Sequence, residues 1–300
     1  MLYRLFRIAS ALAQAAPLPV AYRVAEVCGA AVYYLWSGGR RRCIQNMRHV
    51  LGPNAPQHAV EHLARRSFAN YAVYLIDFLR FTEVDAPEVD RRVLFDGWSP
   101  LDAAREDRGI VFVTMHYGNW DLGAAAVAQH GTPISVIADT FADARLNDLV
   151  LGSRRALGME IIPAERMGPS ILRALKNRNI VAMLIDVPPA NEGVEVEFFG
   201  ETIAVHGGPA RIALRANANV VAALVAREDE HSDRVQPVLA PVPFTPSGDL
   251  ERDVRDLTQA IMRALEPLVA RQPEQWYIFR SLWLADRAPL TASTAPASAH

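Results

Sequence analysis

Short apolar runs alternate with stretches of helical periodicity from about residue 91 onward. The runs are rich in β-branched and other large apolar residues, which is typical of buried strands. They lie at residues 93–95, 110–115, 134–138, 160–162, 180–185 and 220–225. Helical patterns separate most of them, for instance at 144–157, 169–177 and 209–216. This alternation predicts an α/β fold with a mostly parallel central sheet flanked by helices.

Helical patterns also dominate before and after this alternation. A basic helix is predicted at 41–51, a long one at 56–81 and another at 247–270, which an aromatic segment at 276–283 follows. Apolar residues recur at helical spacing along the long helix and predict a buried stripe. The stripe consists of Val60, Leu63, Ala64, Phe68, Tyr71, Leu75 and Phe78.

The opposite face of the long helix carries His58, Glu61 and His62, which match the H-x-x-E-H pattern of one metalloprotease group. Two imidazoles four residues apart could hold zinc, with the glutamate as base. A solvated helix face explains the trio more simply, because Arg65 and Arg66 lie beside it. We therefore expect no metal site.

The amino-terminal segment, residues 1–42, is basic and apolar, with six Arg and one acidic residue, Glu26. Its longest uncharged runs, 8–22 and 27–39, are shorter than the ~20 residues that a spanning helix needs. We predict two interfacial helices that associate with a membrane through aromatic and basic side chains. These side chains are Tyr33, Tyr34, Trp36, Arg40, Arg41 and Arg42. The alternative is a helical cap packed on the core.

Composition narrows the class of protein. Of the 300 residues 51% are hydrophobic, which is enough for a large core, and 31 basic residues nearly balance 33 acidic ones. Such a balance lacks the excess of positive charge that is typical of proteins that bind nucleic acid. The two cysteines, Cys28 and Cys43, favour a reducing, cytoplasmic setting over a disulfide scaffold. We predict a membrane-associating segment at 1–42, a main domain at 43–284 and a disordered tail, rich in Ala, Ser, Thr and Pro, at 285–300.

The candidate chemistry lies where the strand at 110–115 ends. His116 follows the strand, Gly118 permits a tight turn, and Asn119 is a candidate N-cap for the next helix. Asp121 falls in the first turn of that helix, from which it could reach back to the imidazole. Ligands of open α/β sheets bind beyond the carboxyl ends of the strands. We expect His116 to act as a general base that Asp121 orients; the alternative is a helix cap and a dipole contact.

The sequence His116-Tyr-Gly-Asn-Trp-Asp121 has H-x4-D spacing and resembles the motif of the lipid A biosynthesis (lauroyl and myristoyl) acyltransferases, within the larger group of glycerolipid acyltransferases. The resemblance covers about residues 1–284. It continues through the segments 46–52 (NMRHVLG), 194–200 (VEVEFFG), 207–215 (GGPARIALR) and 273–280 (PEQWYIFR). It implies an enzyme without a bound cofactor that transfers a fatty acyl chain from acyl-carrier protein or coenzyme A to a lipid-linked hydroxyl.

Two further residues match positions in that family. Arg154 resembles an arginine that helps to bind phosphate or the donor in that family. The adjacent Arg155 is an alternative for this role, and Arg154 could instead be a surface charge on its helix. Asp186 ends the strand at 180–185 and matches the Asp of the family's Asp-Gln pair, whereas Val187 replaces the Gln. This departure favours the glycolipid branch, such as the phosphatidylinositol mannoside acyltransferases, which the chain also resembles.

Other enzyme classes lack their motifs, since no G-x-G-x-x-G follows a strand and neither a P-loop nor a G-x-S-x-G elbow occurs. No Ser or Cys stands in an activated context, so we expect direct attack by the acceptor hydroxyl. We predict an acyltransferase at the cytoplasmic face of the cell membrane, with a glycolipid acceptor, a thioester donor and no nucleic-acid partner. The alternative function is a non-catalytic lipid- or acyl-binding protein on the same fold.

Overall fold

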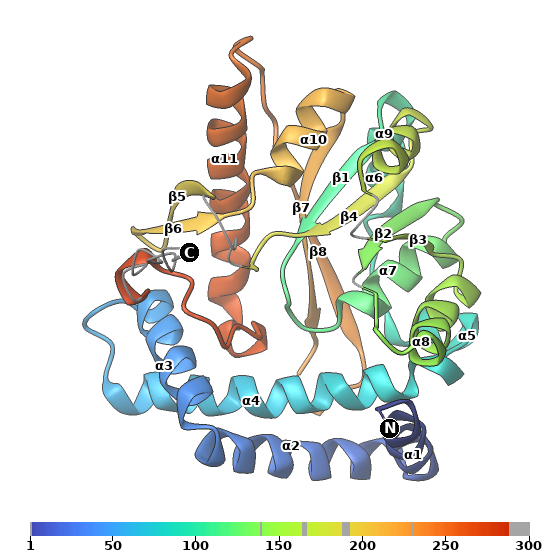
Figure 1. Ribbon diagram of the computed structural model, residues 1–300, viewed down its shortest axis with the longest axis vertical. Helices are drawn as coiled ribbons and strands as arrows, with labels where there is room; N and C mark the ends of the chain where they lie inside the picture. Colours follow the sequence, from blue (N-terminus) through green and yellow to red (C-terminus); the bar gives the residue numbers. More distant parts are fainter. Residues whose placement is uncertain (1, 139, 164–166, 188–192, 230, 288–300) are drawn as a thin grey trace, which may run out of the picture.

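The computed structural model describes residues 2–138, 140–163, 167–187, 193–229 and 231–287. Its central strands are β1 (Ile110–Thr114), β2 (Ile134–Ala138), β3 (Glu160–Pro163), β4 (Ile180–Leu184), β7 (Asn219–Arg227) and β8 (Val235–Pro241). They form one sheet in the order β3-β2-β4-β1-β7-β8 (Figure 1). Neighbouring strands run parallel except at the β7-β8 edge, which is antiparallel. The predicted α/β class with a mostly parallel sheet is confirmed.

Side chains of the sheet alternate between two apolar cores, one on each face. In β1, Val111 and Val113 belong to one core, and Ile110 and Phe112 belong to the other. The first face is covered by α9 (Met167–Lys176), α10 (Gly208–Ala216) and α11 (Leu250–Arg271). The second face is covered by α5 (Ala86–Arg92), α6 (Trp98–Asp107) and α7 (Trp120–Gln129). Burial on both faces explains why the parallel strands read as continuous apolar runs.

A helical layer precedes the sheet in the chain and lies below it in Figure 1. It consists of α1 (Leu2–Ala15), α2 (Leu18–Leu35), α3 (Ser37–Leu51) and α4 (Gln57–Arg80). The helices α1, α2 and α3 all pack on α4. The α2 contact is close because Gly29 has no side chain; a Cβ atom there would lie 2.4 Å from the carbonyl oxygen of Phe68. The two helices predicted within residues 1–42 are present as α1 and α2.

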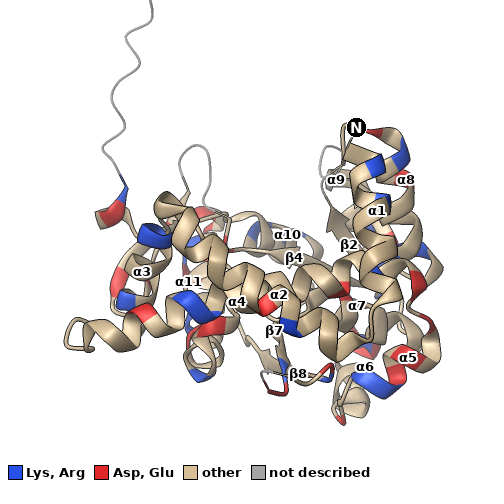
Figure 2. Cartoon of the chain, turned by 90° about the horizontal axis from the view of Figure 1, so that it is seen from below, with Lys and Arg blue, Asp and Glu red and all other residues tan. Residues whose placement is uncertain are grey.

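Large apolar side chains are exposed along α1 and α2. They are Leu2, Leu5, Ile8, Leu12, Val20, Val24 and Val27. Tyr34, Leu35 and Trp36 continue this exposed apolar surface at the end of α2. Figure 2 shows the molecule from the side on which α2 lies, and charged residues are sparse along that helix. None of the described helices combines the length and the apolar character that crossing a bilayer requires.

The sheet also contains an edge strand that the apolar pattern does not reveal. β8 carries Pro237 and Pro241, which interrupt its run and are tolerated because proline occurs on edge strands. The predicted strand at 93–95 is reduced to a single bridge between Val93 and Val235. A separate antiparallel pair is formed by β5 (Val194–Phe198) and β6 (Glu201–Val205).

The beginning of the predicted tail is ordered. Asp286, in the short helix η4 (Leu284–Asp286), lies 2.8 Å from Nε2 of His49. Arg287 donates hydrogen bonds to the carbonyl oxygens of Ala204 and Leu282, at 3.2 and 3.1 Å. These contacts fix residues 285–287 against the domain, and residues 288–300 lie outside the described part of the chain.

Candidate active site

The register of the sheet brings His116 and Asp186 together. β1 and β4 pair in parallel, with Thr114 opposite Leu184. Each of the two site residues lies two positions beyond this pair, so both leave the sheet at the same edge. Nδ1 of His116 lies 2.8 Å from Oδ1 of Asp186.

Asp186 is fully buried, and its second oxygen is also bound. Oδ2 accepts hydrogen bonds from the backbone N–H of His116 and from the indole N–H of Trp276, both at 2.9 Å. These donors hold the carboxylate in one orientation, and a carboxylate beside Nδ1 favours the tautomer in which Nδ1 carries the proton. Nε2, which has no hydrogen-bond partner within the described part of the chain, is then the basic nitrogen.

The pKa values of this pair move in opposite directions. Burial alone disfavours the imidazolium, but the charge and hydrogen bond of Asp186 outweigh it and raise the pKa of His116. Burial likewise favours the neutral form of Asp186, but the charge of His116 and the donated hydrogen bonds outweigh it and lower the pKa of that carboxyl. Asp186 therefore remains ionised and stabilises positive charge on the imidazole.

The loop that carries His116 is fixed by neighbouring backbone. Gly118 has a φ of +58°, and a Cβ atom there would lie 1.9 Å from the carbonyl oxygen of Val225, so glycine is required. The N–H of Gly118 donates to the carbonyl oxygen of Gln275 at 2.9 Å. The N–H of Tyr277 donates to the carbonyl oxygen of His116 at 2.8 Å. The aromatic segment near residue 276 thus positions both the loop and the orienting carboxylate.

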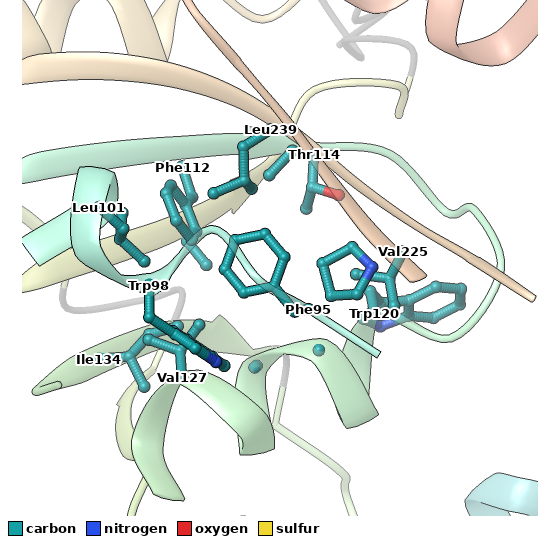
Figure 3. Close-up of a pocket in the computed structure, with 15 residues that line it drawn as sticks. Phe95, Trp98, Leu101, Phe112, Thr114, Trp120, Val127, Ile134, Val225 and Leu239 are labelled. Carbon is teal, nitrogen blue, oxygen red and sulfur yellow. The ribbon is translucent and has the colours of Figure 1, made fainter. Parts of the chain in front are cut away.

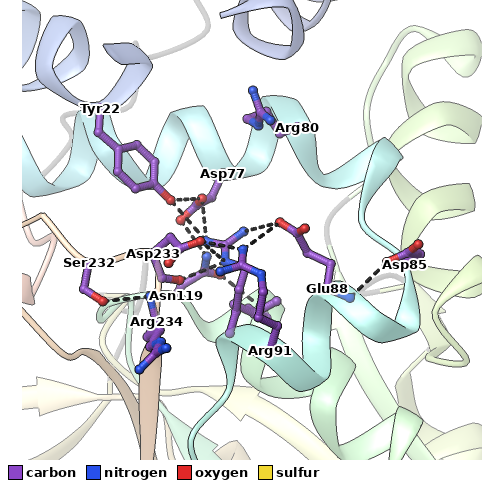
Figure 4. Close-up of polar contacts among 12 residues, drawn as sticks. Tyr22, Asp77, Arg80, Asp85, Glu88, Arg91, Asn119, Ser232, Asp233 and Arg234 are labelled. Atoms are coloured by element: carbon purple, nitrogen blue, oxygen red, sulfur yellow. Dashed lines mark hydrogen bonds and ion pairs between the residues drawn. The ribbon is translucent and has the colours of Figure 1, made fainter. Parts of the chain in front are cut away.

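Asn119 links this loop to a buried charge cluster. Its side-chain oxygen caps α7, as predicted, and its Nδ2 donates to Asp77 of α4 at 2.9 Å. Asp77 also forms ion pairs with Arg92 and Arg227, at 2.8 and 2.6 Å, and accepts a hydrogen bond from the hydroxyl of Tyr22 at 2.5 Å. Figure 4 shows Asp77 facing Tyr22 and Asn119 from α4. The cluster joins α2, α4, α5 and the active-site loop.

Asp121 forms contacts other than the expected one with the imidazole. Its Oδ1 accepts a hydrogen bond from Nε of Arg154 at 2.8 Å, and its Oδ2 accepts one from the hydroxyl of Tyr74 at 3.0 Å. The expectation that Asp121 orients His116 is therefore corrected. The carboxylate leaves the first turn of α7 towards α4 and α8 (Ala144–Ala156), whereas β4 supplies Asp186 directly beside the ring. The charge of Asp121 still acts on the imidazole, as a weaker cause of its raised pKa.

Arg154 lies in this second group of residues. Its side chain is 14% exposed, which argues against a simple surface charge, whereas Arg155 is exposed. Its ion pair with Asp121 neutralises a buried carboxylate close to His116. The binding of a substrate phosphate by Arg154 stays a prediction.

The H-x-x-E-H trio of α4 lies on a solvated helix face, as the simpler interpretation holds. His58, Glu61 and His62 are all exposed. Among the described residues, no group of three or more His, Cys, Asp or Glu side chains is arranged to hold a metal ion.

An apolar pocket lies between the sheet and helices α6 and α7, and one of its lining residues, Trp120, is a neighbour of His116. Trp120 lines its near end, with its ring 5.3 Å from the imidazole and steeply inclined to it. Figure 3 shows the pocket running from Trp120 and Thr114 towards Trp98 and Ile134. The remaining wall includes Phe95, Leu101, Phe112, Val127, Val225 and Leu239. The lining has no charged side chain, and it favours a hydrocarbon ligand.

A profile of the bacterial lipid A biosynthesis acyltransferases matches residues 3–285. The chain belongs to this family. Among its relatives, a phosphatidylinositol mannoside acyltransferase of Mycolicibacterium smegmatis is 28% identical over 263 residues, which cover 85% of this chain and 83% of the relative. One of Mycobacterium tuberculosis is 29% identical over 264 residues, covering 85% and 80%. The protein is therefore an acyltransferase of the lipid A and glycolipid type, and the non-catalytic alternative loses its support.

Sequence reasoning placed His116, Asp121, Arg154 and Asp186 in the site of this acyltransferase, and the structure gathers them in two contacting pairs. The sequence did not point to Trp276 as a site residue, although the motif 273–280 contains it. It also gave no sign that His116 and Asp186 are in contact, because only the pairing of β1 with β4 makes these two strand-terminal residues neighbours.

Proposed function

We propose that this acyltransferase moves a fatty acyl chain from a thioester to a hydroxyl of a glycolipid at a membrane surface. The observation that carries the proposal is the His116–Asp186 pair, whose imidazole contacts Trp120, a residue that lines an apolar pocket. The pocket, with a volume of about 50 Å³, would take the first part of the acyl chain of acyl-carrier protein or coenzyme A and would have to widen for the rest. Its end at Trp120 would leave the thioester carbonyl beside the imidazole.

His116 acts as the general base in this proposal. Its Nε2 removes the proton of the acceptor hydroxyl while the hydroxyl oxygen attacks the thioester carbonyl carbon. The new C–O bond forms, the C–S bond breaks, and the thiolate takes the proton from the imidazolium, which restores the base. Asp186 stabilises the imidazolium through the bond to Nδ1.

A direct transfer is favoured over an acyl-enzyme. Of the two cysteines, Cys43 is buried, and burial raises its pKa to about 12, so its thiol is a poor nucleophile at neutral pH. Cys28 is exposed on α2, in the helical layer below the sheet. Neither is placed to receive an acyl group from a donor in the apolar pocket.

The acceptor we propose is a glycolipid of the phosphatidylinositol mannoside type. The relatives named above are phosphatidylinositol mannoside acyltransferases, and the match covers most of their length. In addition, Val187 of this chain replaces the Gln of the lipid A enzymes that the chain resembles. Asp121 and Arg154 would act together beside the base, with the guanidinium held by the carboxylate and its outer nitrogens turned towards the substrate.

Membrane association completes the proposal. The exposed apolar surface of α1 and α2, with Arg4, Arg7 and Arg23 among its residues, fits an interfacial position at the cytoplasmic face. Large apolar side chains exposed together on neighbouring helices are typical of an interaction site. The interaction would bring the active site to a lipid acceptor that does not leave the bilayer.

The test is thiol release from acyl-coenzyme A and acyl-carrier protein by the purified protein with phosphatidylinositol mannosides in detergent. We expect release that depends on the acceptor, and a mass increase of one acyl chain in the lipid. His116→Ala should lower the rate by about 10²- to 10⁴-fold while the protein stays folded. The proposal would be contradicted if no thiol were released from either donor, or if a folded His116→Ala protein kept the wild-type rate.

A further inference from the structure

A second hollow, distinct from the apolar pocket, lies between α3 and the carboxyl-terminal segment, which are neighbours in Figure 1. It is lined by Arg41, Arg42, Gln45, Arg280, Ser281, Asp286 and Arg287, and we call it the arginine groove. Its volume of about 590 Å³ is within the range of small-molecule clefts, roughly 300–1,000 Å³. Asn46 holds the two walls together, since its Nδ2 donates to the carbonyl oxygens of Ile278 and Arg280, at 3.0 and 2.9 Å.

The arginine groove has an excess of positive charge. Its one acidic residue, Asp286, already contacts the imidazole of His49 at 2.8 Å. Within the described part of the chain, no ion pair engages the guanidinium groups of Arg41, Arg42 or Arg280. Three arginines therefore line one groove without a carboxylate of their own, and guanidinium groups match phosphate through paired N–H donors.

The position of the groove relates it to the active site. Arg280 lies three residues after Tyr277, whose N–H donates to the carbonyl oxygen of His116 at 2.8 Å. At the other wall, Arg41 follows the exposed apolar residues Leu35 and Trp36 by less than two helical turns.

We infer that the arginine groove binds the phosphodiester of the acceptor glycolipid. The inference rests on the proposed function and specifies how the acceptor is recognised. In a phosphoglycolipid the phosphate lies between the acyl tails and the sugar. With the tails at the apolar surface of α1 and α2 and a sugar hydroxyl at Nε2 of His116, the phosphate would meet the groove, since one wall follows Trp36 and the other follows Tyr277, which bonds His116.

The experiment compares two acceptors with the double variant Arg41→Gln/Arg42→Gln. The acceptors are a phosphatidylinositol mannoside and a mannosyl diacylglycerol, which has the sugar and the tails but no phosphate. Both are presented in neutral detergent micelles, so that electrostatic attraction to an anionic bilayer does not contribute. The matched control is Arg65→Gln/Arg263→Gln, which removes the same charge from exposed positions outside the groove.

The groove variant should raise the KM for the phosphate-bearing acceptor by about ten- to hundredfold, with a much smaller change in kcat. The discrimination between the two acceptors should fall by the same factor, and the KM for the thioester donor should not rise. Binding of glycerophosphoinositol, measured by calorimetry, should be lost in the variant and kept in the control, which tests the site without turnover.

A rise in donor KM alone would assign the groove to a phosphate of the donor and overturn the inference. Equal losses with both acceptors would overturn it too, because the phosphate would then have no part in recognition. A wild-type protein that acylates neither acceptor would contradict the proposed function itself, whatever the arginine groove binds. Wild-type transfer to both acceptors with equal KM values leaves the acyltransferase proposal intact and rejects the phosphate site.

Discussion

Two buried carboxylates lie near His116, and their contacts separate their roles. Asp186 touches Nδ1 and is bound by Trp276, whereas Asp121 is bound by Arg154. Only the first contacts the ring and can fix its tautomer, and its charge is the main support of the imidazolium. The second is paired with Arg154, and its charge is a weaker cause of the raised pKa of His116.

The pH dependence of acyl transfer tests this difference between the carboxylates. The base must be neutral, and Asp186 raises its pKa, so the rate should increase with pH with a half-maximal point above ~6.5. Asp186→Asn removes the charge that favours the imidazolium, so the pKa should fall and the rising limb should move to lower pH. The maximal rate should also fall, about 10²- to 10⁴-fold, because the tautomer is no longer held.

Asp121→Asn is the matched control for that profile, since it makes the same change on a carboxylate without a bond to the imidazole. Its rising limb should stay close to that of the wild type. A larger shift in Asp121→Asn than in Asp186→Asn would show that the carboxylate in contact is not the one that supports the base.

Among the elements, α4 connects the helical layer, which we propose to contact the membrane, to the active site. It packs against α1, α2 and α3, and it also supplies Tyr74, which binds Asp121, and Asp77, which binds Asn119 of the active-site loop. The cluster at Asp77 is buried, so its charges are stable only as a group. Burial favours the neutral form of Asp77, but Arg92 and Arg227 outweigh it and lower its pKa to about 2.

Asp77→Ala should therefore destabilise the protein by about 3–5 kcal/mol, because it leaves two arginines buried without their partner. Glu251→Ala, which removes the exposed partner of Arg211, should cost no more than about 1 kcal/mol. Urea unfolding at neutral pH measures both changes. The contribution of Asp77 is present above its unfolded-state pKa of ~3.9 and is lost as the pH falls towards 2, so the difference between wild type and Asp77→Ala should shrink in acid.

At the scale of the whole molecule, the apolar surface of α1 and α2 and the carboxyl edge of the sheet are joined by α4 and by the carboxyl-terminal segment (Figure 1). A protein docked through that surface would keep its base near the lipid headgroups. The proposed acyl pocket and the arginine groove have different linings, so a donor chain and an acceptor headgroup would not compete for space.

The triple variant Val20→Glu/Val24→Glu/Val27→Glu tests this orientation. These positions are 53%, 58% and 71% exposed, so the change spares the core. Affinity for anionic phospholipid vesicles should fall at least about tenfold, since burying one such side chain contributes about 1.5 kcal/mol and glutamate is repelled. Co-sedimentation measures the loss, and Leu250→Glu, an exposed position on α11, serves as the control. Unchanged sedimentation of the triple variant would reject docking through α2.

The sequence by itself determined the class of fold and the position of His116, the proposed base. Apolar runs alternating with helical patterns require a sheet buried on both faces, and His116 at the end of such a run must lie at the edge where ligands bind. Gly118, with its positive φ, and Asn119, which caps α7, are also predictable from the sequence, because a tight turn and a helix start favour these residue types locally.

The tertiary structure decided which groups act together. Spacing along the chain favoured Asp121, five residues from His116, but the register of β1 and β4 puts Asp186, 70 residues away, against the imidazole. The same holds for the cluster at Asp77 and for the arginine groove, whose walls come from opposite ends of the chain. Periodicity reports which face of an element is buried, but the partner across an interface depends on strand order and helix packing, which local sequence does not encode.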